Sequence, residues 1–524
     1  MFLQLNRCST RLLSLILVAG YLLLGCALAQ QSDSAQHGGV ATIALPGEAQ
    51  TLDMHITTAE VAGSISSHWL ETLVAFDSNW SPQPHLAKDI KTSEDGMNYT
   101  FVLREGVKFH DGTDLTADDV VASLRRWTEV SPRGSNVRDY ITSLEAVDDH
   151  TVELSLNAPF APLLSLLAHH SGGAGIYPSE IIEKYGSDPI RDHIGTGPYE
   201  FVQWLPDRHV EVKRFDGYQA LDTASDGYSG ERVAYLDTIR FAVVPETATR
   251  IAGTQTGDYD YGWQIAPDAY AALEADTSVD TVIRKPFIWG VAFFNKRQGL
   301  MTNQKLRQAV NAALDMEELL IAAAGPEEFW NLEHNYMVGD TPFKTEAGAD
   351  QYNQADPERA RQLAEEAGYD GQPIRWLVSP DYNQHYLMSL AAEQQLEAAG
   401  FNIELMAVEW GTLLDIRSQE GAWDVFVTHH GFAPDPVLVN TLSSTYPGWW
   451  DEERRSELVD RVHTATSLEE RQAAWDDLLA YNYEYLPSMM LGELYGLDIK
   501  SPDFQPGEAA TQGMPSYWNS WKEQ

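Results

Sequence analysis

Strand-like and helix-like hydrophobic patterns follow one another along the chain, most clearly after residue 373. Short apolar runs predict strands, and longer segments with apolar residues three and four apart predict helices. The succession reads Ile374 to Val378 as a strand, His385 to Ala399 as a helix closed by Gly400, Ile403 to Val408 as a strand, Thr412 to Gln419 as a short helix, and Trp423 to Val427 as a strand. Such consecutive β-α-β units wind into a parallel sheet, so the pattern predicts an α/β fold.

The loops after these strands are candidate binding positions. Ligands of open parallel sheets bind in the crevice beyond the carboxyl ends of the strands. The residues placed there by the pattern are Ser379 to Tyr382, Glu409 with Trp410, and His429 to Phe432.

Two further helical stripes are predicted to belong to the core. Asp356-Pro357 opens a helix that Gly368 ends, and a second helix runs from Asn303 to Ala324. Their apolar residues share one face each, as expected of helices that pack against a sheet.

Composition indicates a globular chain whose charge disfavours nucleic acid. The 524 residues leave room for two to four domains, and 44% of them are hydrophobic. Asp and Glu number 77 against 35 Lys and Arg, for a net charge of −42, which repels phosphate backbones and anionic membranes. The excess acid fits a salt-adapted or very soluble surface; attraction of a cationic solute is the alternative.

The N-terminus has the pattern of a secretory signal. Arg7 and Arg11 precede an uncharged run from Leu12 to Leu24, and Ala27-Leu28-Ala29 is a signal peptidase site. We therefore expect residues 1–29 to be removed and the protein to be periplasmic. An alternative is a lipoprotein that is lipidated at Cys26. Cleavage after Ala29 would leave no cysteine, which excludes disulfides and thiol catalysis.

Signatures of catalysis and cofactor binding are missing. The chain has no G-x-S-x-G, no H-E-x-x-H and no Gly-Lys pair. Gly195-Thr196-Gly197 begins like a dinucleotide motif, but a strand-like run, Phe201 to Trp204, follows where a helix is needed. The pairs His169-His170 and His429-His430 are neighbours that point apart on a strand. We expect no metal, no cofactor and no enzymatic activity.

Four segments resemble a known family. They are VKFHDGTDLTADDV from Val107, IGTGPYEFVQW from Ile194, KLRQAVNAALDMEEL from Lys305 and DPERARQLAEEAGY from Asp356. They are similar to hallmark segments of the extracytoplasmic solute-binding protein family 5, the peptide, dipeptide and nickel receptors of ABC importers. The resemblance implies a two-lobed periplasmic binding protein fold (type II, cluster C-like) with an inserted subdomain and a two-crossover hinge.

The resemblance also implies a division of the chain. Lobe I would combine residues 38–75, 185–284 and 490–524, with an inserted subdomain at 76–184, and lobe II would be 285–489. The two crossovers would lie near Arg284 to Phe294 and near Leu486 to Leu491.

The ligand anchors of the family's peptide receptors do not carry over. Alignment on Asp435-Pro436 places Phe432 where the family has an Asp that binds the ligand's amino terminus. Tyr386 and Leu387 stand where the dipeptide receptors have an Arg for the ligand's carboxylate. A shift of three residues would instead make Asp435 the amine anchor, and this alternative stays open.

Aromatic side chains and one first-lobe loop complete the candidate site. The loop Thr58, Ala59 and Glu60 matches a family segment that contacts ligand, and Glu60 could replace the missing Asp as partner of an amine. The predicted ligand-binding residues are Thr58, Ala59, Glu60, Trp69, Trp289, Tyr382, Tyr386, Trp410, His430, Phe432, Asp435 and Trp449.

The expected function is solute capture. The resemblance implies a receptor that holds a peptide or peptide-like solute between its lobes and delivers it to ABC permease and ATPase subunits, and we expect a monomer. The alternatives are a receptor for a cationic, opine or oligosaccharide solute, and an exported hydrolase or chaperone-like binder on the same fold.

Overall fold

One long mixed sheet runs through the molecule. The computed structural model describes residues 35–523, so the predicted signal segment 1–29 and Cys26 lie outside the described residues. The strand order is β15 (Ile403–Ala407), β14 (Ile374–Val378), β16 (Val425–Gly431), β12 (Asp280–Phe294), β17 (Ser488–Lys500), β11 (Tyr261–Ile265), β1 (Val40–Leu45), β10 (Thr238–Val243), β9 (His209–Arg214) and β8 (Tyr199–Leu205), with β13 (Trp330–Asn331) also paired to β17.

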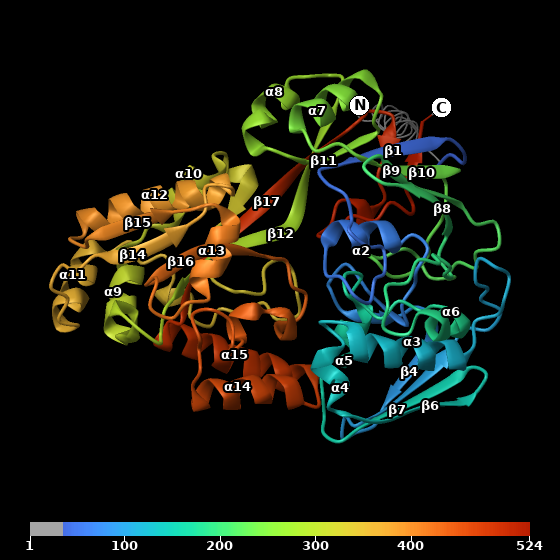
Figure 1. Ribbon diagram of the computed structural model, residues 1–524, viewed down its shortest axis with the longest axis horizontal. Helices are drawn as coiled ribbons and strands as arrows, with labels where there is room; N and C mark the ends of the chain where they lie inside the picture. Colours follow the sequence, from blue (N-terminus) through green and yellow to red (C-terminus); the bar gives the residue numbers. More distant parts are fainter. Residues whose placement is uncertain (1–34, 524) are drawn as a thin grey trace, which may run out of the picture. The chain divides into compact units, whose positions relative to one another are not determined.

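Two long strands join the two halves of this sheet. β12 and β17 are antiparallel and lie side by side at its centre (Figure 1). The C-terminal end of β17 pairs with β11, and the C-terminal half of β12 pairs with β16. The register between β12 and β17 shifts between Arg284 and Ile288, and again between Gly290 and Val291. The ladder is therefore irregular where the chain passes from one half to the other.

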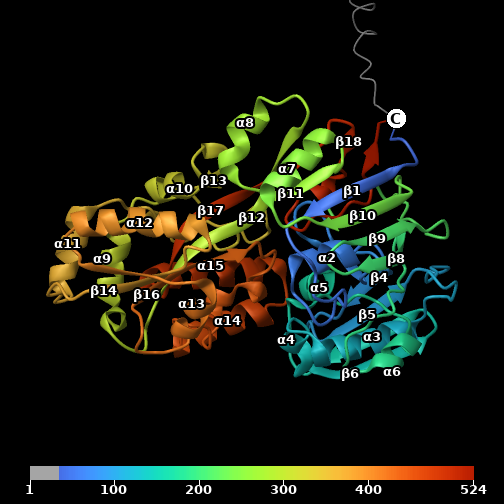
Figure 2. The same cartoon turned by 45° about the horizontal axis from the view of Figure 1, so that its top comes forward.

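The predicted β-α-β units are confirmed. β14 pairs in parallel with both β15 and β16, and α12 (Asn383–Ala398) and α13 (Trp410–Arg417) are the intervening helices. α10 (Met316–Ala324) and α12 lie on one side of this part of the sheet, and α14 (Glu453–Thr464) and α15 (Leu468–Tyr485) on the other (Figure 1 and Figure 2). β16 differs from the prediction, because it begins at Val425 and includes His429 and His430.

The single helix predicted from Asn303 to Ala324 is wrong. The structure has two helices, α9 (Gln304–Ala313) and α10 (Met316–Ala324). Asp315 separates them: its backbone is extended, and its side chain accepts hydrogen bonds from the Glu317 and Glu318 amides. An aspartate in this position starts a new helix by satisfying free amides at the N-terminus. The helix predicted after Asp356 is confirmed as α11 (Pro357–Glu366).

A second, antiparallel sheet lies in the N-terminal part. Its order is β4 (Ala87–Thr92), β5 (Asn98–Leu103), β7 (Thr151–Leu156) and β6 (Ile141–Asp148). The other elements there are α2 (Glu60–Ser66), β2 (Val74–Phe76), β3 (Pro82–Pro84), α3 (Ala117–Val130), α4 (Ser135–Arg138), α5 (Leu163–Ala168) and α6 (Ser179–Tyr185). Further along the chain come α7 (Thr247–Thr256), α8 (Tyr270–Glu274), β18 (Phe504–Gln505) and β19 (Trp521–Lys522).

The glycines of the segment from Ile194 serve packing. A Cβ on Gly195 would lie 1.9 Å from the backbone oxygen of Trp69, and one on Gly197 would lie 2.5 Å from that of His68. Only glycine permits so close an approach of two backbones. Strand β8 follows, as the sequence predicted, so these glycines do not begin a dinucleotide-binding helix.

The buried apolar side chains form two large clusters. The first cluster draws on residues 41–263 and 504–518, and the second on residues 288–494. Phe432 and Leu438 pack against both. Within the described residues, no helix is long and apolar enough to cross a membrane. The exact boundaries of the lobes stay a prediction. They are 38–75, 185–284 and 490–524 for lobe I, 76–184 for its inserted subdomain, and 285–489 for lobe II.

Candidate functional site

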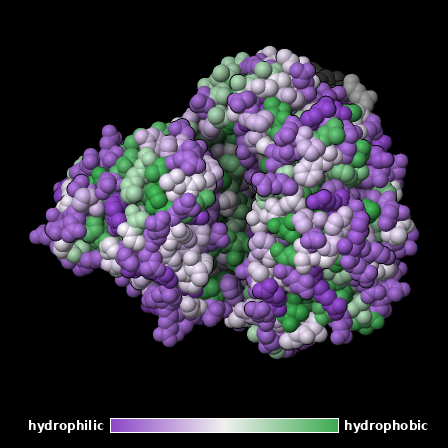
Figure 3. Space-filling model, in the orientation of Figure 1, coloured by the Kyte–Doolittle hydropathy of each residue, from purple (hydrophilic) through white to green (hydrophobic). Residues whose placement is uncertain are grey.

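A pocket of about 860 Å³ lies at the carboxyl ends of β14 and β16. One wall comes from the residues after β14, Asp381 to Gln384, and from His429 and Gly431 of β16. The crossing strands supply Phe287, Ile288 and residues 494–497. The end of α10 and the two residues after it supply residues 321–326, and the part of the chain before β12 supplies Glu60, Thr247 and residues 264–268. The face drawn in Figure 3 is hollowed between the α10–α12 side and the α2 side, and green and white residues show along the hollow. We call this cavity the large pocket.

The rings of Tyr382 and His429 line the large pocket, and those of Trp410 and His385 pack against Tyr382. The ring of Tyr382 lies 4.9 Å from that of Trp410, 5.0 Å from His385 and 5.2 Å from His429, measured between centroids. Nε2 of His385 and Nδ1 of His429 are 2.8 Å apart and share a hydrogen bond. Burial lowers the pKa of His385 to about 3 and that of His429 to about 4. Both imidazoles are therefore neutral at neutral pH, and the wall offers uncharged aromatic surface.

The chain folds locally to present this wall. Asp381 follows β14 directly, and its Oδ2 accepts a hydrogen bond from the Trp410 amide at 2.7 Å, which ties the loop after β14 to the start of α13. Glu409 caps α13 by accepting from the Gly411 and Thr412 amides. Because β14, β15 and β16 are parallel, their following loops meet at one edge, where these side chains converge.

Carboxylates supply the charge of the large pocket. Glu60, Asp268 and Asp381 line it, and its described lining contains no lysine or arginine. Glu60 Oε1 accepts a hydrogen bond from Nη1 of Arg284 at 2.6 Å, and Asp498 lies 3.3 Å from Nε of the same guanidinium. Burial raises the pKa of Glu60, and Arg284 opposes that shift. Arg284 thus counters the charge of Glu60, and Asp268 and Asp381 leave the lining with negative charge.

Several predicted residues lie at or beside the large pocket. Glu60 and Tyr382 line it, and Trp410 contacts Tyr382. Thr58 and Ala59 are exposed and directly precede Glu60, and Tyr386 lies one helical turn after Tyr382. Phe432 follows Gly431; its amide donates to the Phe287 carbonyl at 2.8 Å, and its ring lies 4.2 Å from that of Trp80.

The other predicted residues lie elsewhere. Trp69 is fully buried in the first cluster, 5.7 Å from Phe201. Trp289 is buried in the second cluster, and the ring of His430 lies 5.0 Å from it, tilted by 47°. Trp449 packs on Trp423. His429 and His430 thus face different neighbours, as expected for adjacent strand residues. The assignment of the twelve residues to ligand binding stays a prediction.

Asp435 has a partner within the chain. It is fully buried, and both of its carboxylate oxygens accept hydrogen bonds from Arg471, at 2.7 and 2.6 Å. Its Oδ1 also accepts from the Val437 amide. Burial raises the pKa of Asp435, but Arg471 outweighs this and holds it below its usual value. The carboxylate is therefore already neutralised without any solute.

Part of the pocket wall was missed by sequence reasoning. Residues 264–268 and 321–326 come from different segments and reach the pocket only through tertiary packing. His385 was predicted to begin the helix and carries no local sign of its hydrogen bond to His429. Among the described residues, no three His, Cys, Asp or Glu side chains come together in an arrangement that could hold a metal ion.

Comparison with known proteins identifies the family. Residues 81–450 match the model of the bacterial extracellular solute-binding proteins, family 5. The chain belongs to this family. Its members are binding proteins and not enzymes, and they work outside the cytoplasm.

Two curated relatives and one solved structure illustrate the similarity. The chain is 28% identical over 500 residues to a probable peptide ABC transporter periplasmic-binding protein, y4tO, of Sinorhizobium fredii, covering 90% of this chain and 92% of that one. It is 29% identical to the glutathione-binding protein GsiB of Escherichia coli, covering 75% and 74%. The ABC transporter substrate-binding protein CtaP of Listeria monocytogenes superposes with a TM-score of 0.82, at 22% identity, over 93% of this chain and 100% of that one. The predicted fold class is confirmed.

Proposed function

We propose that this family 5 protein captures a peptide or peptide-like solute in the large pocket and delivers it to the permease and ATPase of an ABC importer. The observation that carries the proposal is the position of the pocket: about 860 Å³, at the carboxyl ends of β14 and β16, with walls from both sides of the β12 and β17 crossing. That volume suits a small peptide. The relative y4tO is named a probable peptide ABC transporter periplasmic-binding protein, which supports the same class of solute.

The lining favours a solute with a positive group and apolar parts. Asp268 and Asp381 supply negative charge, and the rings of Tyr382 and Trp410 offer faces for cation–π and stacking contact. Phe432 at the position of the family's amine-binding Asp disfavours a free dipeptide held in the usual way. A cationic solute that is not a peptide, such as an opine, is the second candidate, and the same acidic lining supports it.

The proposed receptor is exported and acts as a monomer. Residues 1–29 would be removed, so that Gln30 begins the mature chain; a product that starts at a lipidated Cys26 is the alternative. Lobe I and lobe II, divided as the sequence predicts, would close on the solute by bending at β12 and β17, where the ladder is irregular.

Peptide binding should be saturable and without turnover. We expect calorimetric titration of the mature protein with a panel of di- to pentapeptides to give at least one saturable isotherm. The same peptide should change the tryptophan emission, because Trp410 lies beside the pocket. Chromatography should recover the peptide intact. Steady conversion of peptides into products, or no saturable binding by any of them, would contradict the proposal; mass spectrometry of solute that co-purifies with the protein would then identify the class.

Replacing Phe432 by alanine should weaken solute binding. The ring packs on Trp80 and beside Gly339 and Gly513, between the two clusters. We expect a loss of roughly 1–3 kcal/mol in the free energy of binding, the scale of lost aromatic packing and cation–π contact, with the fold intact. Phe432→Asp should raise affinity for dipeptides with a free amino terminus, because the new carboxylate stands where the family's Asp binds that amine. It should lower affinity for the native solute, whose apolar part would lie against the ring of Phe432.

Phe201→Ala is the matched control for the Phe432 variants. Neither ring is among the residues that line the large pocket, but Phe432 directly follows Gly431, which lines it, whereas Phe201 is a partly buried ring of the first cluster that lies against Trp69. We expect it to lower stability without changing the affinity of the folded protein. Calorimetry of both alanine variants measures the difference, and equal affinities would place Phe432 outside the binding site.

A further inference from the structure

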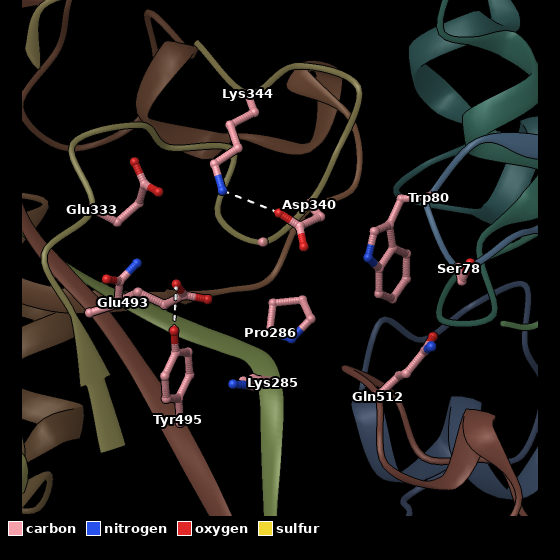
Figure 4. Close-up of a pocket in the computed structure, with 12 residues that line it drawn as sticks. Ser78, Trp80, Lys285, Pro286, Glu333, Asp340, Lys344, Glu493, Tyr495 and Gln512 are labelled. Atoms are coloured by element: carbon pink, nitrogen blue, oxygen red, sulfur yellow. Dashed lines mark hydrogen bonds and ion pairs between the residues drawn. The ribbon is translucent and has the colours of Figure 1, made fainter. Parts of the chain in front are cut away.

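A second pocket, of about 300 Å³, lies beside the crossing strands. Glu493 and Tyr495 of β17 line it, together with Glu333 from the segment after β13. Figure 4 shows these three side chains on one side of the pocket, and Trp80 and Gln512 on the other. Tyr495 also lines the large pocket, so the two cavities share a wall. We call this second cavity the acidic pocket.

Glu493 is a buried carboxylate that lacks a full set of partners. The residue is only 3% exposed, and it sits in β17 opposite Trp289. The Tyr495 hydroxyl donates to its Oε2 at 3.3 Å. Its Oε1 is buried and receives no well-formed hydrogen bond from any described residue. An unsatisfied buried carboxylate oxygen is costly, so its presence at the wall of a cavity calls for a partner.

The charges around Glu493 leave negative charge in excess. Glu333 is also buried, at 7% exposure, and its Oε1 accepts from the Asn335 amide at 2.9 Å. Nζ of Lys344 pairs with Asp340 at 3.2 Å. Nζ of Lys285 lies 5.4 Å from the centre of the Tyr495 ring. Lys344 is thus paired with Asp340, and Lys285 lies over the ring of Tyr495.

The pKa of Glu493 is raised by its burial and by this surplus of negative charge. Burial and the Glu333 carboxylate raise it to about 7, and the Asn331 amide, the Tyr495 hydroxyl and Lys344 oppose the rise. A cation placed at Oε1 would lower this pKa and supply the missing contact.

Trp80 provides an aromatic face across the acidic pocket. Its backbone has a φ of 58°, a left-handed conformation that is unfavourable for a bulky residue. The turn that holds it is fastened by Asp77, whose Oδ1 accepts from the Asn79 and Ser81 amides and whose backbone oxygen accepts from the Trp80 amide. The ring is therefore fixed at the pocket wall, where it can stack on a flat cation.

We propose that the acidic pocket binds the cationic end of a solute side chain, a guanidinium or ammonium, between Glu493 and Trp80. This inference rests on the proposed function, because the solute's main part would occupy the large pocket beyond Tyr495. It makes the receptor selective for solutes with a basic side chain. A guanidinium suits the site best, because it can donate to Oε1 of Glu493 and stack on an indole at the same time.

Alanine tripeptides with one arginine, citrulline or norleucine at each position test the proposal by calorimetry. Citrulline has nearly the shape of arginine without its charge. We expect arginine at one position to bind about tenfold or more tighter than citrulline there. Glu493→Gln should reduce that ratio to about threefold or less and leave the norleucine peptide unchanged. Glu145→Gln, which removes an exposed carboxylate of β6, should change none of these ratios.

The acidity of the medium gives a readout that needs no variant. Glu493 must be ionised to hold a cation, and Glu333, Asp340, Lys285 and Lys344 are the charged groups that line the pocket with it. The preference for arginine over citrulline should therefore be larger at about pH 8 than at about pH 5.5, on either side of the pKa of Glu493. This measurement stands even if Glu493→Gln does not fold.

The outcomes separate the two proposals. Peptides that bind with no preference for arginine at any position or pH would overturn the acidic pocket and leave peptide capture standing. If no peptide binds, agmatine serves as a probe: a thermal shift by agmatine that Glu493→Gln removes would support the acidic pocket and reject peptide capture. No shift by agmatine would reject both. An arginine preference retained by Glu493→Gln would also overturn the inference.

Discussion

Replacing Arg284 by methionine is expected to lower the free energy of unfolding by about 3–5 kcal/mol, the scale of breaking a buried ion pair. The guanidinium is fully buried at the start of the crossing, and it pairs with both Glu60 and Asp498. It also donates to the Gly513 carbonyl at 3.2 Å. Without it, two carboxylates lose their counter-charge. Denaturant unfolding measures the change.

Acid should restore part of the stability that Arg284→Met loses. Burial already raises the pKa of Glu60 and of Asp498, and Arg284 opposes both shifts. In the variant both folded-state pKa values rise further above their unfolded values, so the native state binds more protons. The destabilisation is then largest at neutral pH and shrinks as the pH falls through the raised pKa values.

An exposed ion pair is the control for Arg284. Arg461→Met breaks the contact with Asp477, where both side chains are more than half exposed. We expect about 0–1 kcal/mol from this change and no such dependence on pH. If Arg284→Met were no more destabilising than Arg461→Met, the buried triad would not be the link that joins Glu60 to the crossing strands.

The β-α-β region could be predicted because its signals are local. β14 has the bounds given by its apolar run, and Gly400 follows α12 with a φ of 97°, which favours glycine. The break between α9 and α10 was missed because apolar residues continue on both sides of Asp315. The prediction followed the apolar residues that continue along the helix and did not take Asp315 as the N-cap of a new helix.

Residues of the large pocket could be predicted only where they lie at the carboxyl ends of strands. Tyr382 and His429 follow from the rule on strand ends, and both line the large pocket. Trp69 and Trp289 are fully buried. The sequence could not distinguish core from cleft at these positions, because a large aromatic residue is as suited to a core as to a binding cleft. Glu493 was missed although its signal is visible: it is the one charged residue between Ser488 and Leu497.

Replacing Asp435 by asparagine should lower the free energy of unfolding by about 3–5 kcal/mol, because it leaves Arg471 buried without a counter-charge. Arg471 also donates to the Val462 carbonyl at 3.0 Å, so it cannot easily turn to solvent. Arg471→Met should have an effect of similar size, and the double variant should lose much less than the sum of the two. The deficit of Asp435→Asn should shrink in acid, because the wild-type carboxylate has a lowered pKa and its contribution is lost as it is protonated.

The same Asp435 variant decides between the two alignments of the ligand anchor. If Asp435 bound the amino terminus of a peptide, folded Asp435→Asn would lose most of its affinity for peptides with a free amine. The structure predicts the opposite, since both carboxylate oxygens are held by Arg471 and the side chain is fully buried. We expect the folded fraction of Asp435→Asn to bind within about twofold of wild type, a difference below the worth of one ordinary hydrogen bond. Calorimetry at a temperature where the variant is folded measures this, and a loss of affinity confined to peptides with a free amine would restore Asp435 as the anchor.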